Sequence, residues 1–234
     1  MKYFLNSSHK NFIKSYKEND ERWRYFFVGI VVSFIAIIAF VNIIQYYFKE
    51  KGNLKIDMLA IEYVKTIENN ALNSFFKAFT NIGDPVSVII MTVVVVALLY
   101  LKGMKNERTF FALNILGVWL FNEVLKISFK RDRPSIRIIS ARGYSLPSGH
   151  AMVFLTFSII IVYLILLYIK NKSIKYIIST IFIIMAIFIG LSRVYLRVHY
   201  LSDVLAGWSA AMFWSGINIA IHRFSYYRKI IKML

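Results

Sequence analysis

Residues 151–169 read AMVFLTFSIIIVYLILLYI and contain no charged side chain. A helix rises 1.5 Å per residue, so about 20 apolar residues cross the hydrocarbon core of a bilayer. The string PSGH (147–150) directly precedes this run, and Lys170 and Lys172 follow it. A single run of this kind also occurs as a buried helix of a soluble protein, so the rest of the chain decides the fold.

Five further stretches have the same character. They cover residues 25–48, 85–101, 109–129, 174–191 and 200–221. Hydrophobic residues make up 58% of the chain, against roughly 45–50% in soluble domains. The sequence therefore predicts an all-α bundle of six transmembrane helices in the cell membrane.

Residues 54–80 separate the first two runs. Their apolar residues recur at intervals of three and four, and charged residues such as Lys55, Asp57 and Glu62 fall largely between them. This pattern predicts an amphipathic helical segment that lies on the outer leaflet or against the bundle. We expect one membrane-embedded domain over residues 25–222, flanked by basic tails at 1–24 and 223–234.

The formal net charge is +17, from 29 basic and 12 acidic residues. Basic residues are concentrated in both tails and in the turns at 102–108 and 170–175. With six spans these four segments lie on one side, which the positive-inside rule makes cytoplasmic. Both termini are therefore expected inside. A basic balance alone fits a nucleic-acid binder as well as a membrane protein, and the placement of the apolar runs favours a membrane protein with no nucleic-acid partner. The absence of cysteine excludes disulfides and iron–sulfur clusters.

Cations also gather in segments that this topology places outside. These are Lys126, Lys130, Arg131, Arg133, Arg137, Arg142, Arg193 and Arg197. Their position opposes the orientation bias, and Arg with Lys suits a phosphate ligand. We expect Lys130, Arg131, Arg137 and Arg197, which fit no motif described below, to be solvated or in contact with lipid headgroups.

Three short strings lie in the same segments: KISFKRDRP (126–134), PSGH (147–150) and SRVYLRVHYLSD (192–203). Ser148, Gly149 and His150 occupy the start of a predicted helix, where free N–H groups favour an anion. His199 and Asp203 are four residues apart and share one helix face. An aspartate so placed can hold one imidazole nitrogen and leave the other free to attack.

These three strings resemble the motifs of the type 2 phosphatidic acid phosphatase superfamily of membrane lipid phosphatases. That family reads Lys-(six residues)-Arg-Pro, then Pro-Ser-Gly-His, then Ser-Arg-(five residues)-His-(three residues)-Asp, and every fixed position is filled here in order. The resemblance implies metal-independent hydrolysis of a lipid phosphate or diphosphate at the outer face, with no cofactor. Phosphatidylglycerol phosphate, phosphatidic acid and undecaprenyl diphosphate are the implied substrates, and the oligomeric state stays open.

The resemblance also implies a role for each motif residue. His199 resembles the nucleophile that becomes a phosphohistidine, Asp203 the group that orients it, and His150 the general acid and base. The phosphate-binding positions are Lys126, Arg133, Ser148, Gly149 and Arg193. No metal ligand is expected.

Three other functions fit part of the pattern. A phosphotransferase would pass the same phosphoryl group to a lipid or sugar hydroxyl. Vanadium haloperoxidases share the motifs, but they are soluble proteins. An anion or lipid transporter would need ionisable residues in mid-span, whereas here the charges lie at the ends of the spans.

Overall fold

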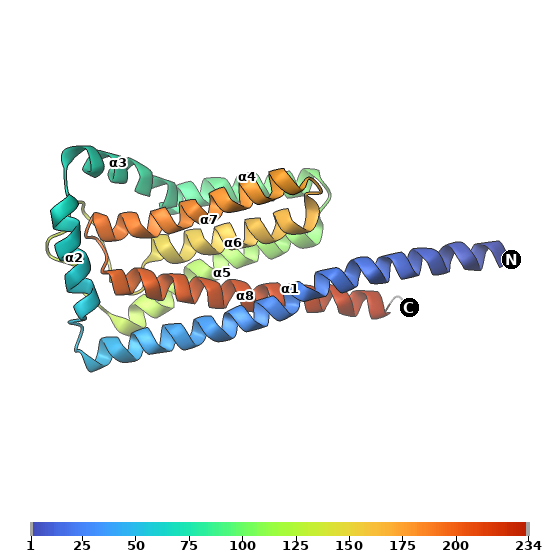
Figure 1. Ribbon diagram of the computed structural model, residues 1–234, viewed down its shortest axis with the longest axis horizontal. Helices are drawn as coiled ribbons and strands as arrows, with labels where there is room; N and C mark the ends of the chain where they lie inside the picture. The colour runs from blue at the N-terminus through green and yellow to red at the C-terminus, as the bar shows by residue number, and fades with distance from the viewer. Residues whose placement is uncertain (1, 233–234) are drawn as a thin grey trace.

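Eight α-helices and one short 3-10 helix make up the part of the chain that the computed structural model describes, which is the backbone of residues 2–232 and the side chains of residues 23–226. In chain order they are α1 (Lys2–Lys49), α2 (Lys55–Ile67), α3 (Asn70–Thr80), η1 (Asn81–Gly83), α4 (Pro85–Leu101), α5 (Lys105–Phe129), α6 (Gly149–Tyr168), α7 (Lys172–Tyr195) and α8 (Leu201–Lys232). Figure 1 shows them as a bundle closed at one end by α2. No strand occurs among the described residues, which confirms the predicted all-α class.

Within the described residues, five helical segments are long and apolar enough to cross a membrane. They are Trp23–Lys49, Lys105–Phe129, Gly149–Tyr168, Lys172–Tyr195 and Leu201–Tyr226. A sixth candidate is a bent pair, in which Asn70–Gly83 and Pro85–Leu101 meet at 46°. α4 alone has 17 residues, about 25 Å of helix, so it is shorter than the other spans. The chain is a multi-pass membrane protein with five or six spans.

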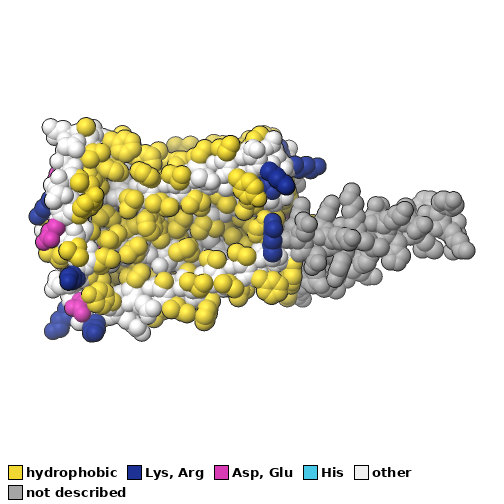
Figure 2. Space-filling model, in the orientation of Figure 1, with side chains coloured by type: hydrophobic (Ala, Val, Ile, Leu, Met, Phe, Trp, Pro, Cys, Tyr) yellow, Lys and Arg dark blue, Asp and Glu magenta, His cyan; other side chains and the backbone are white. Residues whose placement is uncertain are grey.

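The outer surface of the bundle is a band of apolar side chains. Val93, Leu113 and Ile177 are each 61% exposed. Such a continuous apolar surface is rare in soluble proteins and matches the hydrocarbon core of a bilayer. Figure 2 shows this band, with Lys and Arg side chains at both ends of the bundle and Asp and Glu side chains at the end that carries α2.

α6 forms the centre of the bundle. In the most apolar 18-residue segment of α6, 67% is buried, against 17% in the corresponding segment of α1. α6 packs against α5, α7 and α8. Because α6 begins immediately after Pro147 and Ser148, the PSGH string lies at the middle of one end of the bundle. The free N–H groups of the first helical turn are therefore presented there.

The segment predicted as one amphipathic helix over residues 54–80 is two helices, α2 and α3. The break falls at Glu68 and Asn69, because the Asn69 side chain accepts a hydrogen bond from the Leu72 N–H (2.9 Å) and starts a new helix. α2 lies across the end of the bundle in Figure 1. Asp57 falls among the polar positions of the pattern, yet only 2% of it is exposed, because it is paired inside the protein as described below.

The start of α1, the end of α8 and the α4–α5 and α6–α7 connections all lie at the end of the bundle opposite α2 (Figure 1). This grouping agrees with the predicted set of same-side segments. The tail side chains at 1–22 and 227–234 lie outside the described residues. Arg223, expected at the start of a basic tail, is instead 2% exposed with its guanidinium over the Tyr226 ring at 5.0 Å, because α8 continues past it.

Candidate active site

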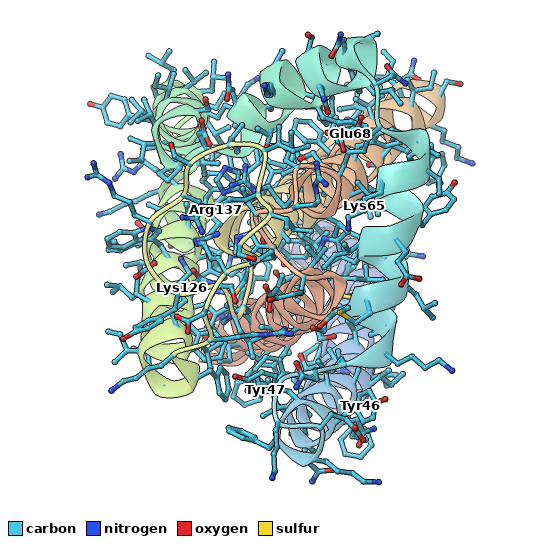
Figure 3. The ribbon with its side chains drawn as sticks, turned by 90° about the vertical axis from the view of Figure 1, so that its left-hand side faces the viewer. Tyr46, Tyr47, Lys65, Glu68, Lys126 and Arg137 are labelled. Carbon is cyan, nitrogen blue, oxygen red and sulfur yellow. The ribbon has the colours of Figure 1, made fainter. Side chains whose placement is uncertain are left out.

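A cavity of about 350 Å³ lies at the end of the bundle that carries α2. Its walls come from η1, the starts of α4 and α6, the end of α5, the connection between α5 and α6, and the α7–α8 turn. Six of the predicted site residues line it: Lys126, Arg133, Gly149, His150, Arg193 and His199. Ser148 and Asp203 are fully buried next to lining residues. Figure 3 looks onto this end, with Lys126 on α5 and Arg137 on the α5–α6 connection labelled.

His199 lies in the turn between α7 and α8 and is 3% exposed. Arg133 Nη1 lies 3.0 Å from its Nε2, and Asp203 Oδ2 lies 3.4 Å from its Nδ1. Since a guanidinium only donates, Nε2 is the acceptor, which places the ring proton on Nδ1 facing Asp203. Burial, with Arg133 and Arg193 nearby, holds the pKa of His199 well below its ordinary value. The imidazole is therefore neutral, with its lone pair on Nε2.

Arg133 is held by the backbone around it. It donates to the carbonyls of Arg142 (3.0 Å), Gly143 (3.0 Å) and Tyr144 (3.2 Å) in the α5–α6 connection. A further bond runs from Nη1 to the Val198 carbonyl at 3.0 Å. These bonds aim one edge of the guanidinium at His199, so its charge stands directly beside Nε2.

The other predicted phosphate-binding residues surround the same space. Arg193 donates from Nη1 to the Thr80 hydroxyl at 2.7 Å, while its buried Nε has no partner among the described residues. A Cβ on Gly149 would come within 3.0 Å of Asn122 Oδ1 and 3.4 Å of Lys126 Nζ. Only glycine therefore lets the lysine reach the start of α6 without displacement.

His150 has a partner that the sequence analysis missed. Its Nε2 lies 2.5 Å from Asp84 Oδ1, and Asp84 stands immediately before Pro85 at the start of α4. The sequence signal was a lone carboxylate between the amphipathic segment and an uncharged apolar run. A carboxylate at this distance stabilises the protonated imidazolium.

Arg131, expected to be solvated, is 5% exposed. It donates from Nη1 to Asp203 Oδ1 (2.7 Å) and from Nη2 to Asp57 Oδ2 (2.7 Å). Arg197 was also expected to be solvated, but it pairs with Glu68 at 2.7 Å. Both expectations were wrong because the acidic partners are far away in sequence. Asp57 and Glu68 reach these arginines only because α2 and the turn after it fold against this end of the bundle.

Two further polar residues belong to the cavity wall. Glu123 pairs with Lys126 at 3.1 Å. Asn122 donates to the Pro147 carbonyl at 3.4 Å, and it also lines the cavity. Among the described side chains, no three of His, Asp or Glu gather as metal ligands would.

A second cavity, of about 320 Å³, lies between α4 and α5. Its walls are almost entirely apolar and include Ile89, Val93 and Leu116. It shares Pro85, Val88, Trp119 and Val153 with the first cavity. The charged pocket at the end of the bundle therefore adjoins an apolar one between α4 and α5.

Comparison with solved structures finds the same fold in two bacterial proteins. One is a transmembrane PAP2 type phosphatidylglycerolphosphate phosphatase from Bacillus subtilis, with a TM-score of 0.70 and 22% identity over 86% of this chain and 96% of that one. The other is LpxE from Aquifex aeolicus, with a TM-score of 0.57 and 21% identity over 74% of this chain and 98% of that one.

Sequence comparison finds phosphatidylglycerophosphatase B of Bacillus subtilis (strain 168), which is 36% identical over 98 residues. The match covers 40% of this chain and 47% of that protein, so it spans about half the length of this relative. The family model of the PAP2 superfamily matches residues 107–227, which include all three motif strings and most of the helices that carry them. The chain belongs to the PAP2 superfamily.

Proposed function

We propose that this protein is an integral membrane lipid phosphatase that hydrolyses a lipid phosphate or diphosphate through a phosphohistidine on His199. The observation that carries this proposal is the neutral, buried His199, whose Nε2 faces a cavity lined by Lys126, Arg133 and Arg193. Family membership and the similarity to phosphatidylglycerophosphatase B support the reaction class.

In the first step, His199 Nε2 attacks phosphorus and the bond from phosphorus to the leaving oxygen breaks. His150 gives its proton to that oxygen, and the Nδ1–H of His199 stays with Asp203. In the second step, His150 removes a proton from water as the water oxygen attacks phosphorus, and the P–N bond breaks to release phosphate. Both steps need an in-line geometry with charge stabilisation on the equatorial oxygens.

The cations supply that stabilisation. Arg133 gives one N–H to His199 in the structure, and an arriving phosphoryl oxygen would accept this N–H in its place. The exchange would free the Nε2 lone pair at the moment when phosphorus comes within reach. Arg193 Nε and the Ser148 hydroxyl, both buried without partners among the described residues, are further donors for the phosphoryl oxygens.

The apolar cavity between α4 and α5 fits the alkyl part of a lipid. A substrate with its phosphate among the cations would direct its chain past Trp119 into this space. The adjacency of a charged and an apolar cavity favours a lipid over a soluble phosphate ester. The substrates that we propose are phosphatidylglycerol phosphate, phosphatidic acid and undecaprenyl diphosphate.

The test is phosphate release by the detergent-purified protein from a panel of these three lipids in the presence of EDTA. We expect hydrolysis of at least one of them, which is lost in His199→Ala. Activity that strictly requires added Mg²⁺ would contradict the metal-independent mechanism. Transfer of the phosphate to an added lipid or sugar alcohol, without free phosphate, would favour the phosphotransferase.

We further propose that the active site faces the extracytoplasmic side and that both termini are cytoplasmic. The chain has no cysteine, so a single introduced thiol reports one position. Ser135→Cys, in the α5–α6 connection, is expected to react with an impermeant thiol reagent added to intact cells. Ser173→Cys, at the start of α7 just after the α6–α7 connection, is expected to react only after lysis. The reverse pattern would overturn the orientation.

The pairing of His150 with Asp84 predicts a pH effect. The first step needs neutral His199 and protonated His150, so the rate follows a bell-shaped profile. Asp84→Asn removes the negative charge that favours the imidazolium, and we expect the alkaline limb to move to lower pH by about one unit. The acid limb, set by the low pKa of His199, is expected to stay in place. An unmoved alkaline limb in kcat/KM profiles would rule out this role for Asp84.

A further inference from the structure

Arg131 joins two carboxylates from opposite ends of the chain. One is Asp203, next to His199, and the other is Asp57, on α2; each lies 2.7 Å from a guanidinium nitrogen. All three side chains are buried, with exposures of 5% for Arg131, 2% for Asp57 and 0% for Asp203. Buried ions are stable only when they are paired and hydrogen-bonded, so these three depend on one another.

Further contacts leave the guanidinium little freedom. Its Nη1 also donates to the Ser202 hydroxyl (2.7 Å), and its Nη2 to the Gly52 carbonyl (3.1 Å). Its carbon lies 4.0 Å from the ring centre of Tyr200 and 4.9 Å from that of Tyr47. Arg131 is thereby fixed in position by residues at the end of α1 and after it, and by residues at the start of α8.

Asp57 also anchors the start of α8. The Ser202 N–H donates to Asp57 Oδ1 (2.8 Å), and the Ser202 hydroxyl donates to Oδ2 (2.7 Å). Ser202 is the second residue of α8 and immediately precedes Asp203. One carboxylate of α2 thus holds both the arginine that binds Asp203 and the backbone from which Asp203 projects.

The orientation of Asp203 follows from these contacts. Its Oδ1 accepts from Arg131, while its Oδ2 accepts from the Tyr200 N–H (2.9 Å) and lies 3.4 Å from His199 Nδ1. An arginine bonded to Oδ1 sets the rotation of the carboxylate that turns Oδ2 toward the imidazole.

The charges of the group have a second consequence. Arg131 alone would neutralise Asp203 and remove its electrostatic effect on His199. With Asp57 present, the two carboxylates and one guanidinium carry a net charge of about −1. That charge stands behind His199, where it stabilises the positive charge that the ring acquires when Nε2 bonds to phosphorus.

We propose that Asp57 is a positioning residue of the reaction, which acts through Arg131 to orient Asp203 and to keep one negative charge behind His199. α2 is then part of the catalytic apparatus as well as a helix at the end of the bundle. This inference rests on the proposed function, in which His199 is the nucleophile.

Asp57→Asn keeps the size of the side chain and removes its charge. We expect kcat for phosphatidic acid to fall by about 10- to 100-fold, as for other residues that orient a catalytic group indirectly. KM is expected to stay within about twofold, because Asp57 does not line the cavity. The matched control is Glu68→Gln, which breaks the ion pair with Arg197 and removes another link to the α7–α8 turn. This control is expected to keep kcat within about twofold.

A double-mutant cycle separates positioning from general structural damage. In an Asp203→Asn background, Asp57→Asn is expected to lower the remaining kcat by less than about twofold, because its target is already gone. An equal fold-loss in both backgrounds, or an unchanged kcat in Asp57→Asn, would overturn the inference. If His199→Ala kept full activity, the proposed function itself would fail.

Thermal unfolding of each purified variant accompanies the kinetics. If Asp57→Asn does not fold, the same cycle is run with Ser202→Ala, which removes the hydroxyl between Asp57 and Arg131 and keeps all charges. We then expect a loss of about threefold in kcat in the otherwise native chain and no further loss beside Asp203→Asn. Equal losses in both backgrounds would again contradict the positioning role.

Discussion

His199→Ala is expected to lower kcat by about 10⁴-fold or more, because the variant lacks the atom that bonds to phosphorus in the proposed mechanism. His199 is 3% exposed, and its pKa is held low by burial and by the neighbouring arginines. A neutral imidazole in the wall of a cavity lined by Lys126, Arg133 and Arg193 can act as a nucleophile toward a bound phosphate. Phosphate release by the purified variant, with the lipid that the native protein hydrolyses best, measures the effect.

A labelling experiment extends this prediction. The native protein, quenched during turnover of a lipid labelled in its phosphate, is expected to retain label that is stable to alkali and labile to acid, as phosphohistidine is. His199→Ala should retain none. His222→Gln is the control, since His222 bonds to Tyr163 (2.8 Å) on α6 and lies outside the cavity lining. Label that persists in His199→Ala would place the covalent bond on another residue.

His150→Ala is expected to lower kcat for a lipid phosphate by about 10²- to 10⁴-fold, the range of a general acid or base. An alkoxide is a poor leaving group, and the variant has no proton to give it. His150 lines the same cavity as His199 and is held by Asp84, which suits a group that exchanges protons during the reaction.

The choice of substrate sharpens this second prediction. Nitrophenyl phosphate has a leaving group that needs no proton, so His150→Ala should phosphorylate His199 readily. The following attack by water still lacks its base. We expect a burst of about one nitrophenol per protein molecule, followed by slow turnover, with the phosphoprotein accumulating. Equal losses with both substrates and no burst would show that His150 does not act as acid and base.

The motif residues were predictable because each lies in a short string that matches a motif of the family. The four-residue spacing of His199 and Asp203 predicted one helix face, whereas His199 lies in the α7–α8 turn just before α8. The two side chains are nevertheless 3.4 Å apart. Lys126, Gly149 and Arg193 likewise line one cavity, as the resemblance implied. Their roles in catalysis stay predictions that the variants above address.

The environments of Arg131 and Arg197 could not be predicted from the motifs. Both arginines lie outside the motif positions and were expected to be solvated. In the structure each is paired with a carboxylate on or just after α2. Periodicity placed Asp57 among polar positions because an amphipathic pattern distinguishes polar from apolar residues. It does not distinguish a polar residue that faces water from one that faces a buried partner.

The break in the segment 54–80 has a similar origin. A regular spacing of apolar residues predicted one helix, whereas Asn69 caps a second helix through its side chain. That turn allows α2 to lie across the end of the bundle (Figure 1).

The length of the apolar runs and their local spacing are enough to predict a helical chain that spans a membrane several times, because both act over a few helical turns. The grouping of the reactive residues into one site was implied by the resemblance of the three strings to the family motifs. Which charges are buried together depends on the folded bundle. Asp57, Arg131 and Asp203 are joined across 74 and 72 residues of chain, and Asp84 meets His150 across 66. Such pairs form because the folded bundle brings distant segments together and, around Asp57, Arg131 and Asp203, excludes water, a condition that no short stretch of sequence contains.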